Sequence, residues 1–187
     1  MSNKMPLRQL TQMAMLAAIS IVMVFFIRFP IIPAAPFLEY TPAEVTQMLA
    51  TLIYGPAAGL ILTVVVALVQ GFTVSAHSGP IGIIMNILSV GSLVLTMGLM
   101  LRFGNGAKWL LISMLAGIVA TTATMVFFNL IFTPIFLGVP REAVVEMILP
   151  ILIPFNIIRA GINSAITFVI WRIVGSFLSN RLTTKKL

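Results

Sequence analysis

Cysteine and aspartate are absent from this chain, and histidine occurs only once. The missing cysteines exclude disulfides, thiolate metal sites and cysteine nucleophiles. A single histidine without an aspartate makes neither a metal site nor a Ser-His-Asp catalytic set. The sequence also has no glycine-rich phosphate loop that carries a lysine. We therefore predict that the protein is not an enzyme and has no resident metal or cofactor.

Charged residues are also scarce, at 8% of 187 residues, whereas 60% are hydrophobic. A soluble domain needs more polar surface than this, so the composition indicates an integral membrane protein. A hydrocarbon core about 30 Å thick needs about 20 helical residues per crossing, which allows six crossings. The predicted fold is one all-α membrane domain over residues 1–187, without a removable signal peptide. Its spans are expected at 9–29, 43–54, 56–73, 81–101, 108–132 and 148–178.

The few charges are separated by sign along the chain. All four acidic residues lie in or beside the predicted outer loops, whereas most basic residues flank the opposite ends of the spans, as do both termini. By the positive-inside rule, this basic end and both termini are predicted to be cytoplasmic. The formal net charge of +7 then reflects orientation in a lipid bilayer, and no nucleic-acid partner is expected. The acidic residues are Glu39, Glu44, Glu142 and Glu146.

The first outer loop, residues 28–44, contains four prolines, which make it stiff and unable to continue a helix. Such a loop is suited to cap a cavity. Its end offers two apolar side chains, Phe37 and Leu38, beside the polar Glu39 and Thr41. Thr41 and Glu44 also have the spacing of a helix capping box, so a purely structural role is the alternative for this pair.

The second outer loop, residues 71–80, has glycines near both ends and polar residues between them. We expect residues 72–80 of this loop to act as a lid over a bound ligand. The polar lid candidates are Thr73, Ser75, His77 and Ser78. For His77, an ordinary position on the loop surface is the alternative.

Several polar residues lie inside otherwise apolar spans, where hydrocarbon does not solvate them. Asn156, Arg159 and Asn163 are spaced i, i+3 and i+7 in the last span, so they are predicted to share one helix face. We expect Asn129, Asn156 and Arg159 to be the main donors to a ligand. Asn163 is expected to be a secondary one. The full set is Gln47, Gln70, Asn86, Asn129, Asn156, Arg159 and Asn163.

Three of these polar residues have a structural alternative. Gln70 and Asn86 are suited to amide bonds between helices. Arg159 is suited to a snorkelling anchor, or to an ion pair with Glu142 or Glu146.

In the first span, Ala14 and Ala18 have a small-xxx-small spacing, which lets another membrane helix approach closely. The pattern alone fits docking of a partner subunit and internal packing equally well.

These segments resemble the substrate-binding S components of energy-coupling factor vitamin transporters, which are small six-helix membrane proteins, over nearly the whole chain. The alanine pair resembles the motif with which S components dock on a transmembrane T component. The riboflavin-specific members are the most similar. Those members have an aspartate-rich entry to the second span and a lysine in place of Arg159, so the chain departs from them there. The similar segments are Gly55-Pro56-x-x-Gly59, Asn129 near Thr133-Pro134, and Pro154-Phe155-Asn156-Ile157-Ile158-Arg159-x-Gly161-x-Asn163.

The resemblance implies the vitamin-binding subunit of an importer in the bacterial plasma membrane, working with a T component and two cytoplasmic ATPases. The expected ligand is riboflavin, as a transported substrate, bound beneath the first and third outer loops. Another vitamin, such as pantothenate, folate or a pyridoxine-like compound, is one alternative. A structural or assembly subunit without a ligand is another. The expected binding residues are Phe37, Leu38, Glu39, Thr41, Asn129, Asn156, Arg159 and Asn163.

Overall fold

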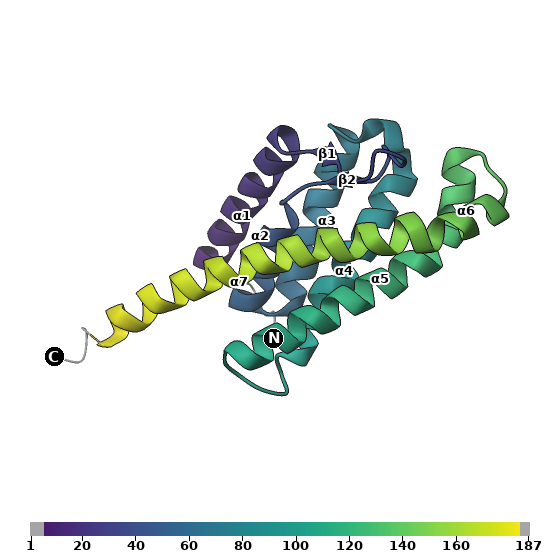
Figure 1. The fold of residues 1–187 in the computed structure, drawn as a ribbon. Coiled ribbons are helices and arrows are strands. Elements are labelled where there is room, and N and C mark those ends of the chain that lie inside the picture. Colours follow the sequence, from purple (N-terminus) through teal and green to yellow (C-terminus); the bar gives the residue numbers. More distant parts are fainter. Residues whose placement is uncertain (1–5, 184–187) are drawn as a thin grey trace, which may run out of the picture.

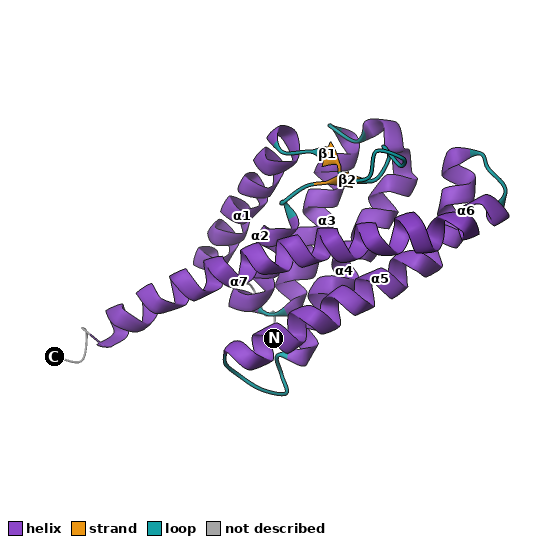
Figure 2. Cartoon of the chain, in the orientation of Figure 1, coloured by secondary structure: helices purple, strands orange, loops and turns teal. Residues whose placement is uncertain are grey.

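The computed structural model describes residues 6–183 of the chain, with side chains described up to residue 173. It is a helical bundle with one short two-stranded ribbon (Figures 1 and 2). The predicted all-helical membrane fold is confirmed. The elements are α1 (Leu7–Phe26), β1 (Phe29–Pro30), β2 (Glu39–Tyr40), α2 (Glu44–Tyr54), α3 (Pro56–Phe72), the 3-10 turn η1 (Ala76–Ser78), α4 (Gly79–Met100), α5 (Ala107–Leu137), α6 (Arg141–Met147), the π-helical segment η2 (Ile148–Leu152) and α7 (Ile153–Thr183).

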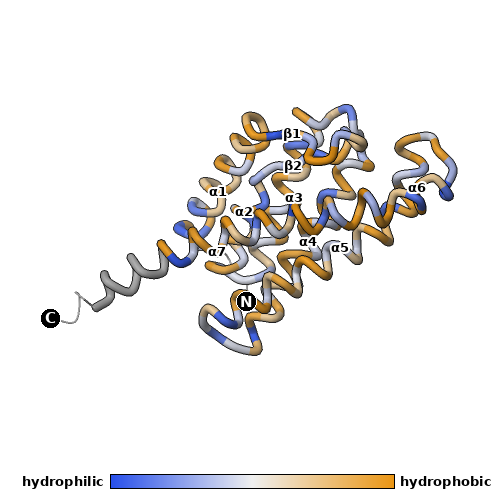
Figure 3. Tube along the Cα trace, in the orientation of Figure 1, coloured by the Kyte–Doolittle hydropathy of each residue, from blue (hydrophilic) through white to orange (hydrophobic). Residues whose placement is uncertain are grey.

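Four helical segments of the described chain are long and apolar enough to cross a membrane: α1, η1 with α4, α5, and α6 through α7. The apolar helix α3 is shorter, at 17 residues. The 11 residues of α2 rise only about 16 Å, roughly half the hydrocarbon thickness. Figure 3 shows hydrophobic residues along most of the helices and hydrophilic ones at the connection between α4 and α5 and around the ribbon. These lengths and compositions are those of a multi-pass membrane protein.

A tight hairpin joins α2 to α3, and the local geometry of Gly55 and Pro56 accounts for it. Gly55 has a φ of +90°, a conformation that favours glycine, and Pro56 begins α3 at a position where its missing N–H is not needed. Gly59 lets the two helices approach closely, because a Cβ at this position would lie 1.9 Å from Oγ1 of Thr51. The hairpin thus brings Thr51 of α2 directly against α3.

Several predicted span boundaries differ from the structure. Helix α1 ends at Phe26 rather than at residue 29, α7 continues to Thr183 rather than to residue 178, and two further differences lie near prolines. The fifth span was expected to end at residue 132, before Thr133-Pro134, but α5 continues to Leu137. Pro134 lacks an N–H, so α5 loses only one backbone hydrogen bond near its end. The carbonyl of Pro134 accepts a hydrogen bond from the N–H of Gly138. The sixth span was expected to begin at residue 148, whereas helical structure begins at Arg141. The π-helical segment Ile148–Leu152 accommodates Pro150, so the chain stays helical.

Helix α4 lies at the centre of the bundle and packs against α2, α3 and α5, while α7 packs against α2 and α5. In Figure 1, α5 and α7 run side by side along the bundle. The main core is apolar and joins four helices. Its buried members are Met48, Val90, Leu93, Val94, Met97, Leu110, Met114 and Ala160. Because α2 contributes Met48 to this core, the polar residues at its N-terminal end are held in place.

Helix α1 lies at the side of the bundle, against α2 and α3. Leu16 and Ala17 pack against the buried residues of these two helices. Ala14 and Ala18 point away from them and are exposed, beside the exposed Met15. Within the chain, the pair is therefore not an internal packing face.

Candidate functional site

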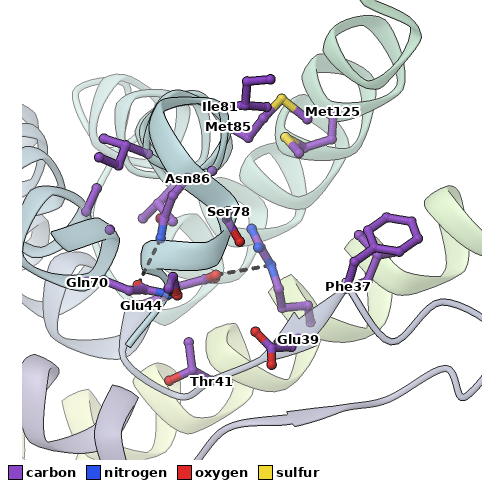
Figure 4. A pocket seen from close by; sticks show the side chains of 18 of the residues that line it. Phe37, Glu39, Thr41, Glu44, Gln70, Ser78, Ile81, Met85, Asn86 and Met125 are labelled. Atoms are coloured by element: carbon purple, nitrogen blue, oxygen red, sulfur yellow. Dashed lines mark hydrogen bonds and ion pairs between the residues drawn. The ribbon is translucent and has the colours of Figure 1, made fainter. Parts of the chain in front are cut away.

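A pocket of about 1100 Å³, part of which is open solvent, lies at the end of the bundle that carries the acidic residues. It is bounded by the first outer loop, the segment around η1, and helices α2, α3, α4, α5 and α7. Figure 4 shows Glu44, Gln70 and Asn86 close together, with the apolar Ile81, Met85 and Met125 grouped apart from them. The pocket therefore combines an apolar wall with a polar one, as small-molecule sites commonly do.

The first outer loop covers this pocket and is held by specific contacts. β1 pairs antiparallel with β2, a ribbon that was not among the predicted elements. Arg28 forms an ion pair with Glu39, and its Nη1 donates to the carbonyl of Val74 at 2.7 Å. Arg28 thus ties the first outer loop to the second. The ring of Phe37 lies 6.4 Å from the ring of Phe136 on α5, which anchors the tip of the loop on a third side.

Glu44 and Arg159 form an ion pair in the pocket wall. Nε of Arg159 lies 3.1 Å from Oε1 of Glu44, and the two side chains are 13% and 5% exposed. Arg159 also donates from Nη2 to the hydroxyl of Ser89 and lies over the ring of Phe155 at 5.7 Å. The pair connects α2 with α7, and Ser89 brings in α4. The pocket thus holds a fixed cation and a fixed anion side by side.

Two structural alternatives considered from the sequence are wrong: the capping box of Thr41 with Glu44, and the ion pair of Arg159 with Glu142 or Glu146. Glu44 does not complete a capping box: it is the first residue of α2, and that helix start has no side-chain cap. The Thr41 hydroxyl instead accepts from the N–H of Ala43 at 3.3 Å. Arg159 pairs with Glu44 rather than with Glu142 or Glu146. Glu44 is buried and Arg159 is largely buried, so each charge needs a countercharge, and the two pair with each other.

Asn163 is fully buried and does not line the pocket. Its Oδ1 accepts from the hydroxyl of Tyr40 at 3.1 Å. Its Nδ2 donates to the carbonyl of Thr41 at 3.2 Å and to Oε2 of Glu44 at 3.0 Å. Burial, together with the nearby Glu44, raises the pKa of Tyr40, so this phenol remains a donor. Asn163 therefore holds the first outer loop and Glu44 in position.

The other two expected amides differ in their surroundings. Asn129 lines the pocket, with Nδ2 donating to the carbonyl of Met125 at 2.7 Å and Oδ1 accepting from Thr133 at 2.6 Å. Asn156 does not line the pocket, although its neighbour Phe155 does. Its Nδ2 donates to the carbonyl of Leu152 at 2.8 Å, and its buried Oδ1 has no hydrogen-bond partner among the described residues. Asn156 thus retains an unused acceptor next to the site.

The expected lid residues are divided by the structure. Ser75 and Ser78 line the pocket, whereas Thr73 and His77 are exposed and do not. Of the first outer loop, all four expected residues line it: Phe37, Leu38, Glu39 and Thr41. The pocket is therefore bounded by the first and second outer loops. Thr133 and Phe136, which lie in α5 where the third outer loop was expected to begin, bound it on a third side.

Polar residues that were not among the expected binding residues also line the pocket: Glu44, Thr133 and three amide side chains. Asn86 donates to Gln70 at 3.0 Å, which is the amide bond between helices given above as their structural alternative. Gln70 in turn donates to the hydroxyl of Ser75 at 3.2 Å. Gln47 donates to the hydroxyl of Ser20 at 3.2 Å. All three amides both bridge helices and face the pocket. The rarity of amide residues inside apolar spans indicated that these three are important. It did not show whether they bond neighbouring helices, line the pocket or do both.

Comparisons with known proteins agree along the chain. Residues 8–171 match the family described as ECF transporter, substrate-specific component. The riboflavin transporter RibU of Staphylococcus aureus (strain TCH60) is 27% identical over 177 residues, covering 91% of this chain and 92% of that protein. The riboflavin transporter FmnP of Bacillus subtilis (strain 168) is 27% identical over 172 residues, covering 88% and 90%. A solved structure described as the S component of a bacterial ECF transporter matches with a TM-score of 0.80 and 28% identity, covering 91% of this chain and 97% of that one.

Proposed function

The chain belongs to the family of substrate-specific components of ECF transporters, and we propose that it captures riboflavin in the pocket beneath its outer loops. The observation that carries the proposal is the pairing of Glu44 with Arg159 in a wall that faces apolar side chains. The isoalloxazine ring of riboflavin is flat, with an apolar end and a polar edge that has both donors and acceptors. A cation, an anion and several amides opposite an apolar wall suit such a ring.

The proposed contacts follow from the position of each side chain. Ile81, Met85 and Phe155 form apolar surface for the ring. Arg159 and Asn129 contribute donors for its polar edge. Glu39 and Thr41, near the mouth, are suited to the hydroxyls of the ribityl chain. The two relatives named as riboflavin transporters support this choice of vitamin.

Flavin fluorescence provides the test. Purified protein is titrated into riboflavin, with pantothenate, folate and pyridoxine as competitors. We expect saturable quenching at one site per chain, and no displacement by a hundredfold excess of the other vitamins. Absence of quenching, together with thermal stabilisation by one of the competitors, would assign another vitamin. No binding of any vitamin, with Arg159→Ala lowering only stability, would favour a structural subunit.

We further propose that Ala14 and Ala18 on the exposed face of α1 dock on a membrane T component that carries two ATPases. Both alanines are small and exposed, so a partner helix can approach the α1 backbone. Ala18→Trp should keep riboflavin binding and lose co-purification with the T component. Ala123→Trp is the matched control, because Ala123 is also exposed but lies on α5. Equal loss in both variants would refute docking through α1.

A further inference from the structure

A second hollow lies at the opposite end of the bundle from the riboflavin pocket. It is bounded by the turn between α2 and α3, the end of α4, the segment leading into α5, and α7 near Trp171. Its volume is about 1760 Å³, including its open mouth. By the charge distribution this is the cytoplasmic end, so the hollow faces the inner surface of the membrane.

Two arginines from separate parts of the chain line this hollow, Arg102 after α4 and Arg172 on α7. Both are exposed, and neither forms an ion pair with any residue that the structure describes. The four acidic side chains of the sequence are far away along the chain, in or beside the outer loops and α6. Two like charges in one hollow, without a countercharge from the protein, favour an anion from outside it.

The rest of the lining is amphipathic. Leu101 and Leu110 contribute apolar surface, and Trp171 is an aromatic residue of the kind found at membrane interfaces. Asn105 and the hydroxyl-bearing Tyr54 contribute polar groups. Gly106 and Ala107 also line the hollow at the start of α5, where no side chain caps the free N–H groups. Orientation of the chain in the bilayer requires only positive charge at this end. It does not require a hollow that combines two arginines with apolar side chains.

We propose that this hollow binds the phosphate headgroup of an anionic phospholipid from the cytoplasmic leaflet. The two guanidinium groups match phosphate geometry, since each can donate two parallel hydrogen bonds to it. Leu101, Leu110 and Trp171 then contact the glycerol and the start of the acyl chains. Basic hollows between membrane helices at the cytoplasmic side are suited to such headgroups. The inference does not depend on the vitamin bound at the other end.

Native mass spectrometry of the purified full chain in detergent provides the test, with phosphatidylglycerol, phosphatidylcholine and soluble glycerol phosphate as separate probes. We expect phosphatidylglycerol to bind the wild type more tightly than either other probe. The double variant Arg102→Gln/Arg172→Gln should bind it about thirtyfold more weakly. Arg8→Gln/Lys108→Gln is the matched control: it removes two exposed basic residues from the same end, neither of which lines the hollow.

Three results would overturn the proposal. Equal weakening in the two double variants would mean that diffuse surface charge attracts the lipid. Equal binding of both phospholipids would remove the role of the anion. Glycerol phosphate binding as tightly as phosphatidylglycerol would assign the site to a free phosphate compound. Thermal unfolding in detergent, followed by far-UV circular dichroism, reports whether each variant is folded. If the double variant fails this check, Arg102→Lys/Arg172→Lys replaces it and should bind phosphatidylglycerol less tightly than the wild type, because lysine lacks the planar fork.

Discussion

Oε1 of Glu44 on α2 lies 3.1 Å from Nε of Arg159 on α7, and this buried pair connects two helices that are distant in sequence. Burying either charge alone is costly, whereas the pair is partly neutralised and is further bonded by Ser89 and Asn163. The relationship gives Glu44 two roles, one in joining the bundle and one in shaping the pocket. Mutation can separate these roles.

Removing one member of this pair should destabilise the protein more than removing both. Arg159→Met leaves Glu44 buried and charged, which should cost about 3 kcal/mol of unfolding free energy. Glu44→Gln/Arg159→Met should recover about 1–3 kcal/mol of that loss. The unfolding free energy of each variant is measured by titrating a denaturing detergent into protein held in a mild one. Riboflavin affinity should stay low in the double variant, because the donor is gone. A strictly additive double variant would show that the two side chains do not interact.

Asn129→Ala should weaken riboflavin binding and cost less stability than Asn163→Ala, because both side-chain bonds of Asn129 lie within α5. The side chain lines the pocket, and the loss of one donor to the ligand corresponds to about a tenfold weaker affinity. Flavin quenching measures the affinity, and thermal unfolding without ligand is the control. Unchanged affinity would place the ligand away from α5.

Asn163→Ala should have the opposite profile. This buried amide bonds Tyr40, Thr41 and Glu44 but does not line the pocket, so its loss should cost about 2 kcal/mol of stability. Unfolding in the absence of riboflavin measures the effect. A variant as stable as the wild type, with binding abolished, would mean that Asn163 contacts ligand directly.

Arg28→Gln should speed the release of riboflavin about tenfold, since Arg28 connects the first outer loop through Glu39 with the second through the carbonyl of Val74. Stopped-flow fluorescence measures the release rate. Arg141→Gln is the matched control, because Arg141 is an exposed arginine on α6 that does not line the pocket. Similar release rates in both variants would show that this contact does not restrain the loops.

Gly59→Ala should destabilise the α2–α3 hairpin by about 1–3 kcal/mol, because the new Cβ would overlap Thr51. Gly161→Ala should be neutral or slightly stabilising, since nothing lies within 4 Å of the added Cβ on α7. Thermal unfolding of both variants compares the two helical glycines. Equal effects would indicate that helix propensity, and not the close approach, determines the outcome.

The sequence by itself determined the class of the protein and its family. The hydrocarbon core of a membrane accepts apolar side chains and excludes charged ones. A chain with 60% hydrophobic and 8% charged residues is therefore suited to a bundle of membrane helices. The sequence also determined the α2–α3 hairpin, because Gly55 and Pro56 act through local backbone geometry. Asn129 and Arg159 were predicted as site candidates because polar groups inside a span need a specific partner.

Only the tertiary structure decided which partner each polar group has. Glu44 has capping spacing in the sequence, yet it pairs with Arg159, because packing of α2 on α7 brings the two charges together. Helical spacing predicted a common role for Asn156, Arg159 and Asn163, but the structure gives them different surroundings. Periodicity specifies the face of a helix, whereas the neighbours of that face depend on how separate helices pack and on where the first outer loop returns to the bundle.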